Sequence, residues 1–323
     1  MKRSLVTGAT GFVGANLVRR LIRDGHEAHL IVRPAHQSWR LDGIRDDVQL
    51  HEAVLADRES VRGIVNSAKP DFVFHLAAYG AYPQQTGIER MTETNLLGAA
   101  ALIDACVEVG IEAFVQTGSS SEYGYKDREA SEDDRLDPNS HYAITKAAAT
   151  HYCQFTARAR DFHAVTLRLY SIYGPYEEPS RLIPTLILRG LEGKLPLLVA
   201  PDTARDFVYV DDAVQAMLDV ASSSSLPRGS VYNVCSGRQS SLRDVVSIMR
   251  GILNIDEEPV WSTMERRSWD TNVWVGSPAR IERETGWRAA TSIEDGFRRT
   301  VRWFMDCPEM QNFYARRQRI PES

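Results

Sequence analysis

A tyrosine and a lysine, Tyr142 and Lys146, stand four residues apart in a stretch with helical periodicity, so they share one face of the predicted helix. An ammonium group beside a phenol favours the phenolate and lowers the tyrosine pKa from its usual value of about 10. Ser121 follows a predicted strand and could hold a substrate oxygen while the tyrosine transfers a proton. Tyr-x-x-x-Lys pairs also occur by chance on many helices, so the interpretation depends on the rest of the chain.

A glycine-rich turn near the N-terminus supplies that context. It stands between an apolar stretch typical of a buried strand (2–6) and a stretch with helical spacing (16–22). Strand, three glycines and helix together are the context of a dinucleotide fingerprint, in which the glycines permit a tight turn and a close approach to the pyrophosphate. The helix N-terminus offers N–H groups and a positive dipole end to the phosphates. We expect a nicotinamide-type dinucleotide rather than a turn without a ligand, bound by Gly8, Thr10, Gly11, Phe12, Val13 and Gly14.

The end of the second predicted strand (28–32) bears on the choice between NADP and NAD. The ribose-binding residue of such sites follows the glycines by roughly 20 residues, and NAD-specific sites usually have Asp or Glu there. This chain has Val32-Arg33-Pro34 instead. The guanidinium group of arginine is planar and presents several N–H donors in a fixed arrangement that suits a phosphate. We therefore expect Arg33 to bind NADP(H), with NAD as the alternative cofactor and a solvated Arg33 as the alternative role.

Strands and helices alternate over the first 170 residues. Strands are expected at 2–6, 28–32, 49–54, 71–78, 113–117 and 164–170, and long helices at 93–109 and 141–160. This alternation predicts an α/β fold, a Rossmann-type doubly wound parallel sheet. Prolines and glycines are more frequent afterwards. We expect a dinucleotide-binding domain over 1–170, to which 206–230 returns, and a smaller, irregular α/β substrate lobe over 171–205 and 231–307. Residues 308–323 are expected to form a loosely held tail.

Composition excludes several classes of function. The 323 residues are 43% hydrophobic and 25% charged, as in soluble globular proteins. A formal net charge of −5 is not the basic footprint of a nucleic-acid-binding protein. No apolar run approaches membrane-spanning length and no signal peptide is evident. The four cysteines lie far apart and the eight histidines show no ligand spacing. We therefore expect free thiols in a reducing cytoplasm and no metal site.

With these residues in place, residues 1–304 resemble the extended short-chain dehydrogenase/reductase family, particularly its nucleotide-sugar epimerases, dehydratases and ketoreductases. The matching motifs are the glycine fingerprint, His75-Leu76-Ala77-Ala78, Asn95-x-x-Gly98, the serines before Tyr123-Gly124, Tyr142 with Lys146, Arg168 with Tyr173-Gly174-Pro175, the stretch 205–212 and Tyr232-Asn233-Val234.

The resemblance implies roles for individual residues. Ser121, Tyr142 and Lys146 form the catalytic group, which Asn95 supports. Asn95, Tyr142 and Lys146 also bind the cofactor, Lys146 through its ribose hydroxyls. Leu76, Ala77 and Ala78 lie against the cofactor, since small residues at a strand end let it approach the backbone. Arg205, and either Arg266 or Arg267 ahead of Asp270, grip the diphosphate of a sugar nucleotide, because arginine meets phosphate bidentately. Ser120 and Ser171 are further candidates for substrate contact, and Ser171 stands where the family often has Asn.

Departures from the family pattern reduce the number of reactions that the chain is expected to catalyse. Dehydratases that resemble this chain carry an acidic residue beside the catalytic serine or threonine, and Ser120 and Ser121 occupy those places. Glu122 comes one position later, which on a strand points a side chain to the other face. The Ser-x-Glu-Tyr-Gly ending resembles that of reductases acting on nucleotide-linked 4-keto-6-deoxy sugars. We expect NADPH-dependent reduction of such a sugar.

Three alternatives remain open at this point. They are an NAD-dependent sugar-nucleotide 4-epimerase, a 4,6-dehydratase and a non-enzymatic dinucleotide sensor, because fold does not fix function. A homodimer is also expected, as in relatives, since five alanines on the two long helices would allow close helix–helix approach. These are Ala99, Ala100, Ala147, Ala148 and Ala149.

Overall fold

A seven-stranded parallel sheet forms the centre of the computed structural model, which describes all residues except 83, 264–271 and 320–323. Every neighbouring pair of its strands is parallel. The order across the sheet is β3 (Val48–Glu52), β2 (Glu27–Val32), β1 (Arg3–Thr7), β4 (Phe72–His75), β5 (Ala113–Ser119), β6 (Ala164–Leu169) and β9 (Ser230–Val234). The order reverses between β1 and β4, and ligands bind at the carboxyl ends of strands at such a point.

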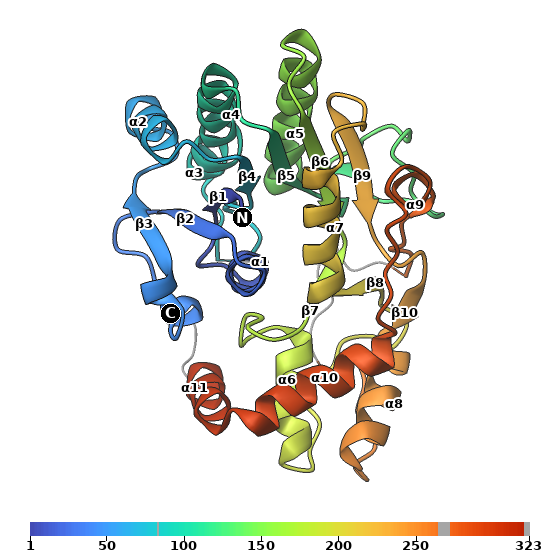
Figure 1. Cartoon of the computed structure of the whole chain (residues 1–323). Helices are drawn as coiled ribbons and strands as arrows, with labels where there is room; N and C mark the ends of the chain where they lie inside the picture. The colour runs from blue at the N-terminus through green and yellow to red at the C-terminus, as the bar shows by residue number, and fades with distance from the viewer. Residues whose placement is uncertain (83, 264–271, 320–323) are drawn as a thin grey trace.

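Helices cover both faces of this sheet (Figure 1). On one face, α1 (Phe12–Arg23) and α7 (Val210–Ser222) pack into one hydrophobic cluster with the strands. On the other, α2 (Arg58–Ala68), α4 (Gly98–Val109) and α5 (His141–Ala159) form a second cluster. Strands buried on both faces have continuous apolar sequences rather than alternating ones, as β4 and β5 do. The predicted doubly wound α/β fold is confirmed.

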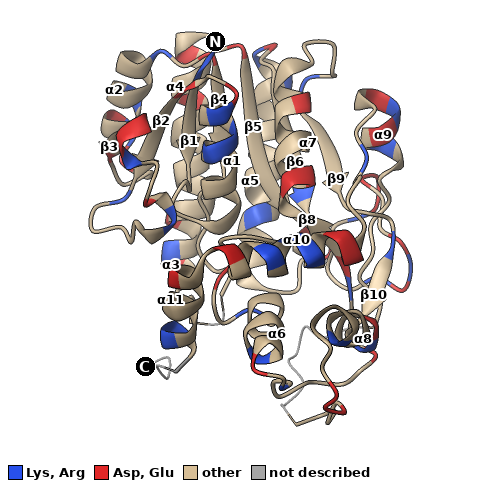
Figure 2. Ribbon diagram, turned by 60° about the horizontal axis from the view of Figure 1, so that its bottom comes forward, with Lys and Arg blue, Asp and Glu red and all other residues tan. Residues whose placement is uncertain are grey.

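A smaller lobe surrounds a three-stranded sheet of β7 (Ser171–Tyr173), β8 (Ala204–Tyr209) and β10 (Gln239–Ser241). Its core combines these strands with α6 (Leu182–Leu191), α8 (Leu242–Leu253) and α10 (Ile293–Asp306). A further helix, α9 (Ala279–Thr285), packs against β9 of the large sheet. Figure 2 shows charges of both signs interspersed on α9 and α10. Among the helices that the structure describes, none is long and apolar enough to cross a membrane.

The boundary between the lobes differs from the expected one. The chain returns to the large sheet through α7 and β9, residues 210–234, rather than through 206–230. β8 pairs with β7 of the small sheet, and β9 pairs with β6 of the large one. Both strands are short apolar runs, and periodicity does not say which sheet such a run joins.

The expectation of a loosely held tail is wrong for residues 308–319, which form α11 (Pro308–Arg319). Tyr314 is fully buried in the core of the small lobe, and its hydroxyl donates to the carbonyl of Glu177 at 2.6 Å. Its ring packs edge-on against Trp39 and Phe304. Two adjacent aromatic residues, Phe313 and Tyr314, thus anchor a helix whose remaining residues are mostly polar.

The predicted helix over 93–109 is interrupted. It begins with α3 (Ile88–Met91), widens into a π-helical turn, η3 (Thr92–Leu97), and continues as α4. Most of the alanines expected to meet a second chain are already buried within this one, namely Ala99, Ala100, Ala147 and Ala149. The large apolar side chains exposed on η3 and α5 are Leu97, Ile144 and Phe155.

Candidate active site

The glycine-rich turn lies at the carboxyl end of β1, next to the end of β4. Gly8 has a positive φ of 72°, and a Cβ built on it would lie 2.5 Å from the backbone nitrogen of Ala77. A Cβ on Gly14 would lie 2.2 Å from the carbonyl oxygen of Gly8. Gly8 is therefore required for the turn to approach the loop after β4, and Gly14 for α1 to approach the turn. No side chain caps the amino end of α1, which leaves its first-turn N–H groups to an anion.

The loop after β4 is held against this turn. The Thr7 hydroxyl lies 2.7 Å from His75 Nδ1 and accepts a hydrogen bond from the Ala77 N–H at 3.3 Å. Burial lowers the pKa of His75 to about 3, so its imidazole is neutral and structural. Leu76 and Ala77 are half-buried, and Ala78 is exposed. Together with the turn, whose Thr10, Phe12 and Val13 are also half-buried, this edge fits the phosphates and ribose of a dinucleotide.

Two arginines lie near the edge of the sheet at which the cofactor is expected to bind. Arg33 is exposed directly after β2, at the same edge of the sheet as the turn. Arg40, which sequence reasoning missed, is buried, and its guanidinium donates to the carbonyls of Tyr176 at 2.7 Å and Thr10 at 3.3 Å. It also pairs with Glu178 at 2.9 Å. Arg40 thus ties the glycine turn to the segment after β7.

The hydroxyl that bonds to Tyr142, the predicted catalytic tyrosine, belongs to Ser119, whereas Ser121 was the predicted partner. Tyr142 is hydrogen-bonded to Ser119, the last residue of β5 and the N-cap of a short 3₁₀ turn, η4 (Ser120–Tyr123). Ser121 lies within that turn and donates its backbone N–H to Ser119 Oγ at 3.2 Å. The strand extends two residues beyond its predicted end and then enters a helical turn, so counting positions as on a strand does not apply to Ser120 and Ser121.

Burial raises the pKa of Tyr142 to about 12, although the bond with Ser119 acts in the other direction. Lys146 is buried on the same helix, and its ammonium donates to the backbone carbonyl of Thr117. Burial lowers the pKa of Lys146 to about 8. The expected lowering of the tyrosine pKa by Lys146 is therefore wrong for this structure, because desolvation of the phenol dominates. A protonated Tyr142 at neutral pH is suited to donating a proton.

Asn95 positions the helix that carries these two residues. It lies buried in η3, where its amide donates to the Thr145 hydroxyl of α5 at 2.9 Å and to the Tyr79 carbonyl at 2.8 Å. Its carbonyl accepts from the Tyr79 N–H at 2.8 Å. The wide π-helical turn therefore links α5 to the loop after β4, a position in which such turns often accompany functional sites.

The carboxylate of η4 is fully engaged in structural bonds. Glu122 is 0% exposed; one oxygen accepts from Arg168 Nε at 2.9 Å and the other from the Ser119 N–H at 2.8 Å. With Ser119 at the N-cap, this arrangement is a capping box. A Cβ on Gly118 would lie 2.7 Å from the carboxylate, so the glycine makes room for it. The expectation that Glu122 points away from the reacting group agrees with these contacts, although the turn and not a strand face directs it.

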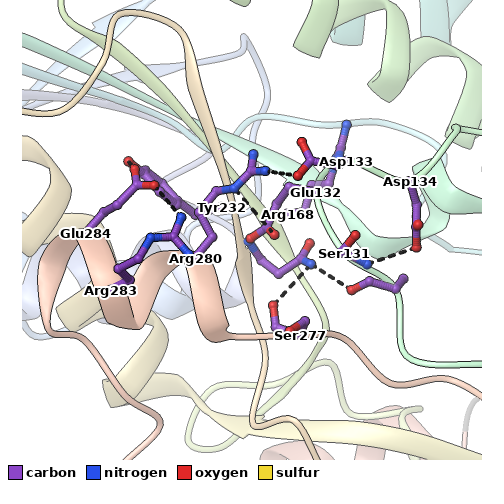
Figure 3. Close-up of polar contacts among 12 residues, drawn as sticks. Ser131, Glu132, Asp133, Asp134, Arg168, Tyr232, Ser277, Arg280, Arg283 and Glu284 are labelled. Atoms are coloured by element: carbon purple, nitrogen blue, oxygen red, sulfur yellow. Dashed lines mark hydrogen bonds and ion pairs between the residues drawn. The ribbon is translucent and has the colours of Figure 1, made fainter.

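A buried polar network continues from this ion pair. The hydroxyl of Tyr123 accepts from Arg168 at 2.9 Å and donates to Asn233 of β9 at 2.7 Å. Asn233 in turn donates its backbone N–H to Glu132, whose other oxygen lies 3.9 Å from Arg280 of α9. Figure 3 shows this outer part, where the loop with Glu132 meets α9. The network thus connects η4, β9, α9 and the loop over 126–140 and holds these four elements together.

Two of the substrate candidates, Ser120 and Arg205, lie next to a tryptophan that sequence reasoning missed. Trp274 donates its indole N–H to Ser120 Oγ at 3.1 Å. The guanidinium carbon of Arg205, on β8, lies 5.5 Å from the centroid of the indole ring. Ser171 is half-buried on β7, opposite Phe207 of β8. Arg266 and Arg267 lie outside the described residues.

Replacing Glu122 by glutamine keeps the side-chain shape but removes its charge. Arg168 then stays buried without a counter-charge, so we expect the free energy of unfolding to fall by about 3–5 kcal/mol. Urea unfolding followed by circular dichroism measures the change. The control is Glu108→Gln on the exposed face of α4, which we expect to change it by no more than about 0.5 kcal/mol. Equal effects of the two substitutions would contradict the importance of the ion pair.

Comparisons with known proteins agree with this geometry. The model of the NAD dependent epimerase/dehydratase family matches residues 4–235. The chain is 27% identical to the dTDP-glucose 4,6-dehydratase of Neisseria meningitidis serogroup B, over 95% of this chain and 94% of that protein. It is 26% identical to a trifunctional UDP-glucose 4,6-dehydratase/UDP-4-keto-6-deoxy-D-glucose 3,5-epimerase/UDP-4-keto-L-rhamnose-reductase of Arabidopsis thaliana, over 95% of this chain but 48% of that protein. The chain thus spans about half the length of this plant relative.

Among solved structures, the UDP-glucose 4-epimerase of Thermus thermophilus in complex with NAD is similar with a TM-score of 0.78 and 28% identity. The likeness covers 94% of this chain and 99% of that one. The family model covers well over half of the chain, from β1 to the residue after β9. The chain belongs to the NAD dependent epimerase/dehydratase family.

Proposed function

We propose that the protein catalyses the NADPH-dependent reduction of a nucleotide-linked 4-keto-6-deoxy sugar. The observation that carries the proposal is the bond between Tyr142 and Ser119 beside a turn whose carboxylate, Glu122, is bound by Arg168. Tyr142 can donate a proton, and the carboxylate of Glu122 is already bound to Arg168. This combination suits the reduction of a carbonyl better than the elimination of water.

A bound nicotinamide cofactor would supply the hydride that reaches C4 of the sugar. The hydroxyl of Ser119 holds the C4 carbonyl oxygen, and Tyr142 donates its phenolic proton to that oxygen as it becomes a hydroxyl. The tyrosine then regains a proton from solvent. Lys146 and Asn95 keep α5 in place, Lys146 through the Thr117 carbonyl and Asn95 through Thr145.

The substrate class follows from the relatives and from Arg205. The names of the relatives specify UDP or dTDP sugars, and a diphosphate suits the guanidinium of Arg205. Removal of water from a sugar requires a base and an acid at the reacting carbons. Ser120, however, is bonded to Trp274, and Glu122 to Arg168. A 4-epimerase remains the second candidate because the Thermus relative has that activity in its name.

The test compares Ser119→Ala and Tyr142→Phe with the neighbouring control Ser121→Ala. Purified protein should oxidise NADPH only when UDP- or dTDP-4-keto-6-deoxyglucose is added. We expect Ser119→Ala and Tyr142→Phe to lower kcat by about 10²–10⁴-fold, because both act on the reacting oxygen. NADPH affinity should stay within about threefold, and Ser121→Ala should keep near-normal kcat.

An equal loss in Ser121→Ala would contradict the assignment of Ser119. Protein that is purified with bound NAD and interconverts two sugar nucleotides without added cofactor would contradict reduction and support the epimerase. Binding of the cofactor without turnover of any sugar nucleotide would support the remaining alternative, a non-enzymatic dinucleotide sensor.

We further propose that Arg33 selects NADP over NAD. The charge reversal Arg33→Asp replaces a partner of the 2′-phosphate with a repelling group and offers the ribose hydroxyl of NAD an acceptor. We expect the preference measured by titration with NADPH and NADH to invert. The control is Arg23→Asp, at the opposite end of α1 from the glycine turn. If Arg33→Asp leaves the ratio of the NADPH and NADH affinities unchanged, Arg33 does not bind the cofactor.

We also propose a homodimer that uses η3 and α5. Its support is the exposure of Leu97 (50%), Ile144 (49%) and Phe155 (71%) on these helices, since exposed large apolar groups gathered on one surface mark interfaces. We expect light scattering to report a dimer at micromolar concentration and Phe155→Ser to shift it towards monomer. Met305→Ser, at an exposed site on α10, should leave the mass unchanged. A monomeric wild-type protein would contradict the proposal.

A further inference from the structure

Trp274 lies between the reacting end of the site and the arginine proposed to bind the diphosphate. Its indole N–H donates to Ser120 at 3.1 Å, and Ser120 directly follows Ser119, the partner of Tyr142. The guanidinium carbon of Arg205 lies 5.5 Å from the centroid of the same ring. One side chain therefore reaches from the proposed reaction centre to the proposed diphosphate site.

The segment that carries Trp274 is held in place on three sides. The Trp274 backbone N–H donates to the Gln239 side chain at 3.0 Å. The Val275 carbonyl accepts from the Ala130 N–H at 3.0 Å, and the Gly276 N–H donates to buried Asp206 at 3.3 Å. These bonds come from β10, the 126–140 loop and β8, so the indole is positioned before a substrate arrives. Such preorganisation reduces the entropic cost of binding.

The bond to Ser120 uses the only polar group of the indole. The remaining ring is apolar, and Trp274 is only half-buried. A hydroxyl pressed against this ring would lose its bonds to water without replacement. A methyl group in the same place would gain by leaving water. The ring therefore favours a part of the substrate that carries no hydroxyl.

The geometry of a hexopyranose identifies that part. C1, which carries the diphosphate, and C4, which reacts, are joined by two edges of the ring, one through C2 and C3 and the other through the ring oxygen and C5. The first edge carries hydroxyls in common hexoses, and the second carries the C6 substituent. A side chain that reaches from Ser120 to Arg205 runs along one of these edges, and its apolar ring suits the second.

We infer that Trp274 is a specificity-determining residue that packs against the C6 methyl group and so selects 6-deoxy sugars over 6-hydroxy sugars. The inference rests on the proposed function, since it takes the orientation of the sugar from the roles of Tyr142 and Arg205.

Binding measurements test this inference without turnover. Isothermal titration compares UDP-glucose with UDP-6-deoxyglucose, and the two dTDP counterparts, on wild-type protein and on variants. We expect wild-type protein to bind the 6-deoxy sugar at least about tenfold more tightly, a usual effect for one group in an apolar pocket. Trp274→Ala should reduce that ratio to less than about threefold and leave the affinity for UDP or dTDP alone unchanged.

Two further variants sharpen the comparison. Trp274→Phe keeps an apolar ring and should keep most of the preference. Trp261→Ala removes a half-buried tryptophan whose ring lies near Arg243 and should keep all of it. If Trp274→Ala does not fold by circular dichroism, Trp274→His, with a polar ring, should show the same loss.

The outcomes separate the inference from the proposed function. Wild-type protein that binds both sugars of a pair equally, or a tenfold preference that survives in Trp274→Ala or Trp274→His, overturns the role of Trp274. Wild-type protein that binds none of the four sugar nucleotides overturns the proposed function itself.

Discussion

The buried ion pair between Glu122 and Arg168 determines how the large sheet ends at the candidate site. Arg168 belongs to β6 and Glu122 to the turn that follows β5, so the pair joins two neighbouring strands where they stop. The second oxygen of the carboxylate holds the Ser119 N–H and starts the turn there. Because Ser119 is bonded to Tyr142, this one pair fixes the position of the hydroxyl that we propose holds the substrate, and it also engages the carboxylate of Glu122.

The features that could be predicted from the sequence are those that depend on local pattern. Apolar runs alternating with helical stretches indicate a doubly wound sheet, and the glycine fingerprint indicates the turn after β1, where Gly8 and Gly14 admit no side chain. The path of the chain after β5 was not predicted, although a local signal was present. Ser119-x-x-Glu122 is the pattern of a capping box, which would have shown that the strand ends at Ser119 and that Glu122 bends back onto it.

The remaining features depend on contacts between distant parts of the chain, which local periodicity does not report. Tyr314 makes α11 part of the small lobe through a contact with Glu177, and β9 joins the large sheet only by pairing with β6. The tyrosine pKa is set by burial rather than by the nearby lysine. Trp274 reaches Ser120 across 154 positions of sequence. Sequence reasoning therefore named Ser120 and Arg205 but missed Trp274, which lies next to both of them.

The central claim is a net transfer of hydride to a sugar carbonyl, with Tyr142 as the proton donor. Transfer of label from NADPH that carries two deuterium atoms at C4 of the nicotinamide tests it most directly, with UDP- or dTDP-4-keto-6-deoxyglucose as acceptor. The account predicts one deuterium at C4 of the sugar product by mass spectrometry and NMR, with one NADP formed for each sugar reduced. A sugar product that carries no deuterium, formed while added NADPH is not consumed, would contradict it.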